Sequence, residues 1–228
     1  MMHQSIDKGK VYLYFILLFI LLSVHNINST YSLSNYFKIQ KIEITSDTNE
    51  YFNDKILLSL NSFYNSNIFS IKPNDIKVFL DKFNIISEYK VKKIYPSIIK
   101  IEFKKTNILA YFFENNQKIF IGENGKKIKE IKFSKDNLPL VVGKVNIENF
   151  LILRKYIIDN GFSFNDFNTF YFYKSYRWDL VYKNKLTIKL PIDDLGNSIN
   201  LLKKIIDTKN IENLNIIDLR IKNRIILS

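Results

Sequence analysis

The side chains best suited to specific recognition in this sequence stand close to its C-terminus. Arg220 and Arg224 occur in a chain whose positive charge is carried mainly by lysine, and a planar guanidinium can give two parallel hydrogen bonds to one carboxylate. A chain that ends in a strand tends to leave that strand at a sheet edge, where unpaired backbone groups invite a partner strand. We therefore predict a partner-binding edge formed by Arg220, Ile221, Asn223, Arg224, Ile225 and Leu227. The alternative is that Arg220 only caps the sheet and the last strand faces solvent.

Residue types that catalyse reactions or bind metals are scarce. Cysteine is absent, and the two histidines, His3 and His25, precede any segment that could belong to a folded domain. The usual imidazole base and thiolate nucleophile are therefore missing, and no nucleotide-, metal- or hydrolase-type motif occurs. We interpret Asp193 or Asp194 as a helix cap, and Trp178 as a packing residue rather than a sugar-stacking one. We expect a protein that is not an enzyme and uses no cofactor or metal.

The formal net charge of +12 does not by itself indicate a nucleic-acid partner. Lysine, asparagine, isoleucine, tyrosine and phenylalanine are abundant, which is the residue profile of an AT-rich genome. The lysines are scattered through every segment, whereas clustering is what marks a nucleic-acid site. We predict no nucleic-acid partner.

An uncharged apolar run near the N-terminus predicts a membrane anchor. Lys8 and Lys10 precede residues 11–24, and the next lysine or arginine is Lys38. By the positive-inside rule, residues 1–10 form a cytoplasmic tail, residues 11–27 a single transmembrane anchor, and the remainder lies outside. About 17 residues is the lower limit for a span. The alternative is a cleaved signal peptide, which the absence of alanine after the run disfavours.

Periodicity divides the rest of the chain into two α+β domains. Residues 37–105 alternate or recur in the order strand, helix, helix, strand, strand, with Ile76, Phe79, Leu80 and Phe83 at helical spacing. Residues 106–228 show mixed strands and two flanking helices, the helices marked by apolar positions such as Phe150, Leu153, Ile199 and Leu202. The fold class is α+β: an N-terminal transmembrane helix, a β-α-α-β-β domain, and a mixed β domain with flanking helices.

Several segments, taken in order, resemble one bacterial protein family. Residues 42–44, 67–71 and 91–97 are similar to a POTRA domain. The segments similar to the FtsQ/DivIB cell-division family are residues 118–125, 138–143, 177–180 with 186–190, and 217–220 with Asn223 and Arg224. The resemblance covers nearly the whole chain. Departures are residues 104–110, where only Ala110 fits the family pattern, and Pro191, which stands where the family often has glycine.

The resemblance implies a non-catalytic divisome scaffold of the inner membrane and division septum. Such a protein binds FtsB and FtsL in the periplasm, links early and late division proteins, and helps to control septal wall synthesis. It places FtsB on the closing hairpin, with Arg220 as the charge partner, and a recruitment surface for other division membrane proteins at Lys77 and Lys82. The alternative function is a POTRA-bearing membrane component of polypeptide transport or outer-membrane assembly.

Overall fold

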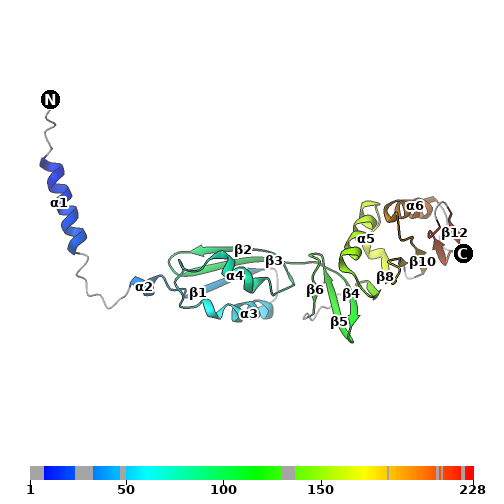
Figure 1. The fold of residues 1–228 in the computed structure, drawn as a ribbon, viewed down its shortest axis with the longest axis horizontal. Coiled ribbons are helices and arrows are strands. Elements are labelled where there is room, and N and C mark those ends of the chain that lie inside the picture. The colour runs from blue at the N-terminus through cyan, green and yellow to red at the C-terminus, as the bar shows by residue number, and fades with distance from the viewer. Residues whose placement is uncertain are drawn as a thin grey trace, which may run out of the picture.

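The computed structural model of the chain describes residues 8–23, 33–46, 50–129, 137–183, 185–208, 211, 213–221 and 224–228. After α1, two folded domains lie end to end, the first with a small sheet and the second with a large one (Figure 1). The helices are α1 (Lys8–Ser23), α2 (Leu33–Tyr36), α3 (Glu50–Ser59), α4 (Pro73–Leu80), α5 (Ile147–Asp159) and α6 (Leu195–Thr208), with short 3-10 turns at Asn61–Phe63 and Phe164–Asp166.

Helix α1 is apolar on every side but short. All residues from Val11 to Leu22 are exposed, and the helix ends at Ser23, whose hydroxyl donates to the carbonyl of Ile20 at 2.8 Å. No helix within the described ranges is both long and apolar enough to cross a membrane. The predicted transmembrane helix is therefore not found: sixteen residues are helical, and residues 24–27, which the prediction needed for its full length, lie outside the described ranges.

The first domain has the predicted order of elements. Its strands are β1 (Lys41–Ser46), β2 (Ile86–Ile94) and β3 (Ile98–Lys105), with α3 and α4 between β1 and β2. The sheet order is β1-β3-β2, in which β3 pairs parallel with β1 and antiparallel with β2. Both β1 and β2 are therefore edge strands.

Helical and strand periodicities meet in one apolar core. Ile76 and Leu80, one turn apart on α4, are almost fully buried, and so are Ile99 and Ile101, two apart on β3. Each such side chain contributes roughly 1.5–3 kcal/mol of burial free energy. Leu60 closes the core from the end of α3. The apolar spacing in the sequence thus correctly predicted which faces of α4 and β3 point into the core.

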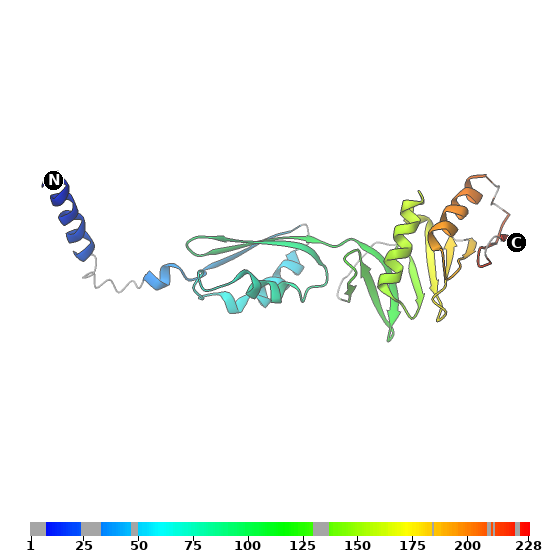
Figure 2. The ribbon, with the colours of Figure 1, turned by 45° about the horizontal axis from the view of Figure 1, so that its top comes forward.

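The second domain is built on a nine-stranded sheet whose last strand is an edge. The strand order is β12-β11-β10-β9-β8-β7-β4-β5-β6. Its strands are β4 (Ile108–Glu114), β5 (Gln117–Gly122), β6 (Lys127–Ile128), β7 (Leu140–Gly143), β8 (Phe167–Phe172), β9 (Trp178–Tyr182), β10 (Leu186–Lys189), β11 (Ile216–Asp218) and β12 (Ile226–Leu227). Helices α5 and α6 lie on the same face of this sheet (Figure 2).

The core of the second domain lies between that face and the two helices. Trp178 is 1% exposed and packs 4.6 Å from the ring of Phe172, so the interpretation of Trp178 as a packing residue is confirmed. Phe150 of α5 meets Phe170 edge-on at 5.4 Å. Gly143 has a φ of +112°, and a Cβ there would collide with the carbonyl oxygen of Phe172. This close approach requires glycine at the end of β7.

The two domains are joined by hydrogen bonds from one loop. The side-chain amide of Asn124 donates to the carbonyls of Asn84 and Ile86 at 2.9 and 3.1 Å. Its backbone N–H donates to the hydroxyl of Thr106 at 3.1 Å. In return, the amide of Asn84 donates to the carbonyl of Lys127 at 2.8 Å. These contacts hold the end of the first domain on the turn after β5.

Replacing Asn124 with alanine should loosen this junction. Two interdomain hydrogen bonds are lost, at about 0.5–1.5 kcal/mol each. Because the chain has no cysteine, a spin label can be placed on each domain, and we expect the distance distribution between the labels to broaden. As the control, Asn160→Ala removes an amide that bonds only the carbonyl of Tyr156 in its own helix. A distribution in Asn124→Ala as narrow as that control would show that the junction does not depend on this side chain.

Candidate partner-binding edge

Strand β12 leaves one side of its backbone unpaired within the described part of the chain. It pairs antiparallel with β11, with Leu227 opposite Ile217 and Ile226 opposite Asp218. Ser228 and Ile216 exchange two backbone hydrogen bonds, of 3.1 and 2.9 Å. Because hydrogen-bonded and non-hydrogen-bonded pairs alternate along antiparallel strands, the N–H and C=O of Leu227 point away from β11.

The side chains of this segment divide between the core and the surface. Leu227 is half-buried and packs against the large core, whereas Ile221, Ile225 and Ile226 are 51%, 39% and 45% exposed. Asn223 lies outside the described residues. The edge therefore offers backbone groups together with a small apolar surface. Whether it binds a partner stays a prediction.

Arg220 already has an internal carboxylate partner. Its Nε donates to Asp218 Oδ1 at 2.9 Å and its Nη2 to Asp218 Oδ2 at 2.5 Å, a bidentate pair. Its backbone N–H also donates to Asp218 Oδ1, at 3.0 Å. The side-chain hydrogen bonds of Arg220 lower the pKa of Asp218 more than burial raises it. Arg220 is therefore held at the end of β11 by a carboxylate of its own chain.

A second arginine–aspartate pair, joined by one hydrogen bond, lies at the start of β9. Arg177 Nε donates to Asp179 Oδ1 at 3.2 Å, and its guanidinium lies 4.4 Å from the centroid of the Tyr173 ring. Lys189 is in register with both Asp179 and Asp218. Two arginines, two buried aspartates and this lysine thus form one charged row across β9, β10 and β11, on the face that carries no helix.

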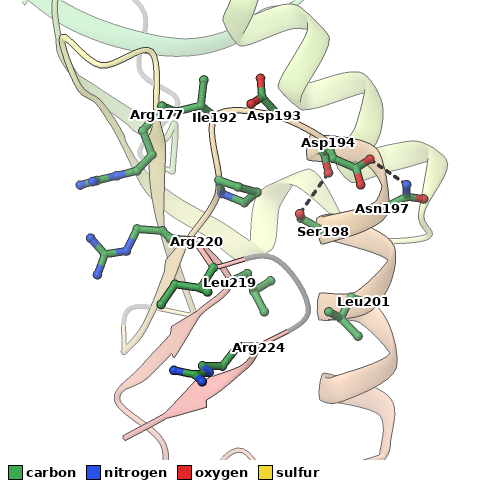
Figure 3. Close-up of a pocket in the computed structure, with 12 residues that line it drawn as sticks. Arg177, Ile192, Asp193, Asp194, Asn197, Ser198, Leu201, Leu219, Arg220 and Arg224 are labelled. Atoms are coloured by element: carbon green, nitrogen blue, oxygen red, sulfur yellow. Dashed lines mark hydrogen bonds between the residues drawn. The ribbon is translucent and has the colours of Figure 1, made fainter.

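A cavity of about 620 Å³ opens beside this row, between the start of α6 and the segment that leads into β12 (Figure 3). Leu201 and Leu219 contribute apolar surface to its lining. Arg224 also lines it, and no ion pair or side-chain hydrogen bond joins Arg224 to another described residue. Among the described residues, Arg224 is thus the lining arginine that forms no ion pair, whereas Arg177 and Arg220 each pair with an aspartate.

The acidic pair at the start of α6 also belongs to this cavity. The carbonyl of Asp194 accepts from the N–H of Ser198 at 3.1 Å, so the helix starts there. The side chain of Asp194 accepts from the amide of Asn197 at 2.7 Å rather than from a backbone N–H. Asp194 therefore occupies the predicted position before α6, but among the described residues its carboxylate bonds a side chain and not the backbone N–H that a capping role requires.

The predicted recruitment residues lie apart from this edge. Lys77 and Lys82 are exposed on or just after α4 in the first domain, and the ammonium of Lys82 lies 4.8 Å from the centroid of the Phe79 ring. The structure does not bring them together with β12, and their role stays a prediction. Sequence reasoning missed the cavity because its lining comes from four separate segments.

Comparison with known proteins identifies the family to which this arrangement belongs. The profile of the "POTRA domain, FtsQ-type" family matches residues 37–104, and that of "Cell division protein FtsQ/DivIB, C-terminal" matches residues 110–220. The chain belongs to the FtsQ/DivIB family. Within it, the first domain is the POTRA domain, and the match to the second domain stops at Arg220, before β12.

Two relatives named "Cell division protein FtsQ" are similar over the same region. One, from Rickettsia prowazekii, is 30% identical over 175 residues, which is 74% of this chain and 64% of the relative. The other, from Bradyrhizobium diazoefficiens, is 27% identical over 149 residues, 62% of this chain and 42% of the relative. The matches thus span less than two thirds of either relative.

The Asp218–Arg220 pair gives a prediction for stability against pH. The pKa of Asp218 is lower in the folded state, so the pair stabilises the fold at neutral pH, and this contribution is lost as the pH falls below about 4. Asp218→Asn should lower the free energy of unfolding by about 1–3 kcal/mol at pH 7, and by less at pH 3, as measured by urea denaturation.

The exposed pair of Lys203 and Asp207 provides the matched control. Asp207→Asn should change the free energy of unfolding by less than about 1 kcal/mol at either pH. A loss in Asp218→Asn that is equal at both pH values would contradict the assigned role of the carboxylate charge.

Proposed function

We propose that this chain is a non-catalytic scaffold of the bacterial cell-division machinery that binds FtsB and FtsL in the periplasm. The proposal is that it links early and late division proteins and so helps to control septal wall synthesis. Membership of the FtsQ/DivIB family supports the role in division. The observation that carries the binding mode is the unpaired outer edge of β12 at the end of the nine-stranded sheet.

In this proposal, a partner segment adds a tenth strand outside β12. The outward N–H and C=O of Leu227 form the first hydrogen bonds with the added strand. The N–H and C=O of Ile225, two residues earlier, point outward in the same way. Arg224 supplies a guanidinium for a partner carboxylate at the rim of the cavity. Arg220 contributes indirectly, because its hydrogen bond to Asp218 holds the end of β11, the strand with which β12 pairs.

We also propose that α1 holds the chain at the inner membrane, with the folded domains in the periplasm. A helix that is apolar on all sides is normally surrounded by protein or lipid, and Phe15 and Phe19 of α1 are 65% and 75% exposed. Lys8 and Lys10 at its start favour a cytoplasmic N-terminus.

Protease digestion of spheroplasts tests this topology. Protease added from outside should degrade the folded domains while a cytoplasmic marker stays intact. Repeating the digestion after lysis controls for intrinsic resistance of the domains. Full protection before lysis, followed by digestion after it, would show that the domains lie inside and would remove the basis for the periplasmic scaffold.

Proline substitutions at successive positions test strand addition. Ile225→Pro removes an outward donor and should abolish capture of the partner, while the second domain keeps its melting temperature. Ile226→Pro removes the inward donor opposite Asp218 and should instead release β12 from β11. Binding is measured by biolayer interferometry with the purified periplasmic region of FtsB.

Charge substitutions test the assignment of the guanidiniums. Arg224→Glu should weaken binding at least tenfold without changing the melting temperature, and an acidic-to-basic change on the partner should restore part of it. Arg220→Glu should weaken binding together with stability, because it faces Asp218 with a like charge. If Ile225→Pro and Arg224→Glu both bind FtsB normally, the interface lies elsewhere.

A further inference from the structure

Four aromatic rings form a continuous cluster at one end of the POTRA domain, in which Phe37 packs against the core and the other three rings are exposed. Tyr36 meets Phe37 edge-on at 5.3 Å, Phe37 meets Phe69 at 5.1 Å, and Phe69 stacks on Tyr95 at 5.0 Å. Tyr36, Phe69 and Tyr95 remain 60%, 59% and 56% exposed. We call these four residues the aromatic tip. Large rings exposed together on a small domain indicate a contact surface.

The backbone holds the aromatic tip in place. The rings come from three segments: the end of α2, the loop before α4, and the turn between β2 and β3. The N–H of Ile68 donates to the carbonyl of Phe37 at 2.9 Å, and the N–H of Phe69 donates to the side chain of Asn67 at the same distance. The rings are therefore presented by an ordered loop rather than by a tail.

The aromatic tip lies at the end of the domain where the chain arrives from α1, opposite the junction with the second domain (Figures 1 and 2). Ten residue steps separate Ser23 from Leu33, which limits the distance between α1 and α2 to about 35 Å. Lys38 pairs with the loop of Phe69, and the exposed Lys72 follows that loop. Aromatic rings beside lysines match the headgroup region of an anionic bilayer.

We propose that the aromatic tip rests on the membrane surface and so sets the orientation of the POTRA domain relative to the bilayer. The tyrosine hydroxyls stay among headgroups while the ring of Phe69 enters the acyl boundary, and the lysines contact anionic lipid. Because α1 must hold the chain at the membrane for this contact to form, the inference rests on the proposed anchoring.

Spin-label accessibility in vesicles tests this contact on the full chain. The chain has no cysteine, so Lys72→Cys places one label beside the aromatic tip, and Glu88→Cys places one near the opposite end of the domain, where Glu88 is exposed. In vesicles of phosphatidylethanolamine and phosphatidylglycerol, we expect the ratio of oxygen to nickel-chelate accessibility to be several-fold higher at 72 than at 88.

A double variant separates the aromatic tip from the anchor. Tyr36→Ser with Phe69→Ser should lower the ratio at 72 to that at 88, whereas Phe113→Ser, which removes a 61% exposed ring from the second domain, should leave it unchanged. A chain that floats with vesicles but has a water-exposed label at 72 overturns the tip contact and leaves the anchor standing. A chain that fails to float overturns both. Shielding of the label in native membranes but not in pure lipid overturns lipid contact in favour of a protein partner.

Discussion

The hydrogen bonds of Asn124 to the carbonyls of Asn84 and Ile86 govern how the rest of the molecule is arranged. They join the turn after β5 to the end of the POTRA domain at which β2 begins. The aromatic tip lies at the other end of that domain, and β12 lies at the far edge of the second sheet. Since both ends are held through this one junction, the orientation of the first domain decides where the β12 edge is presented.

The nine-stranded sheet uses its two faces differently. Leu180, Ile188 and Ile217 occupy neighbouring strands in register and are fully buried beneath the helices. At the next register position, Asp179, Lys189 and Asp218 occupy the opposite face. This alternation follows from the two-residue period of a strand. The same strands can therefore contribute apolar side chains to the core on one face and the charged row on the other.

Local patterns in the sequence predicted the elements well, and long-range contacts poorly. The helical spacing of Ile76 and Leu80 and the alternation of Ile99 and Ile101 selected core positions correctly, because burial enforces those periods. The pairing of Arg220 with Asp218 was missed although residues two apart on a strand share a face, so its signal was present. The cavity and the Asn84–Asn124 junction join segments far apart in the sequence, and no local pattern encodes such proximity.

The length of β12 limits what backbone pairing can contribute to binding. Two residues form the strand, and a short edge resists unwanted self-association. The outward N–H and C=O groups of Ile225 and Leu227 give at most four hydrogen bonds, or about 2–6 kcal/mol in total. Micromolar affinity needs about 8 kcal/mol. Side-chain contacts at the cavity and with Arg224 must therefore supply the remainder, so a partner for this edge is selected by its side chains as much as by its strand.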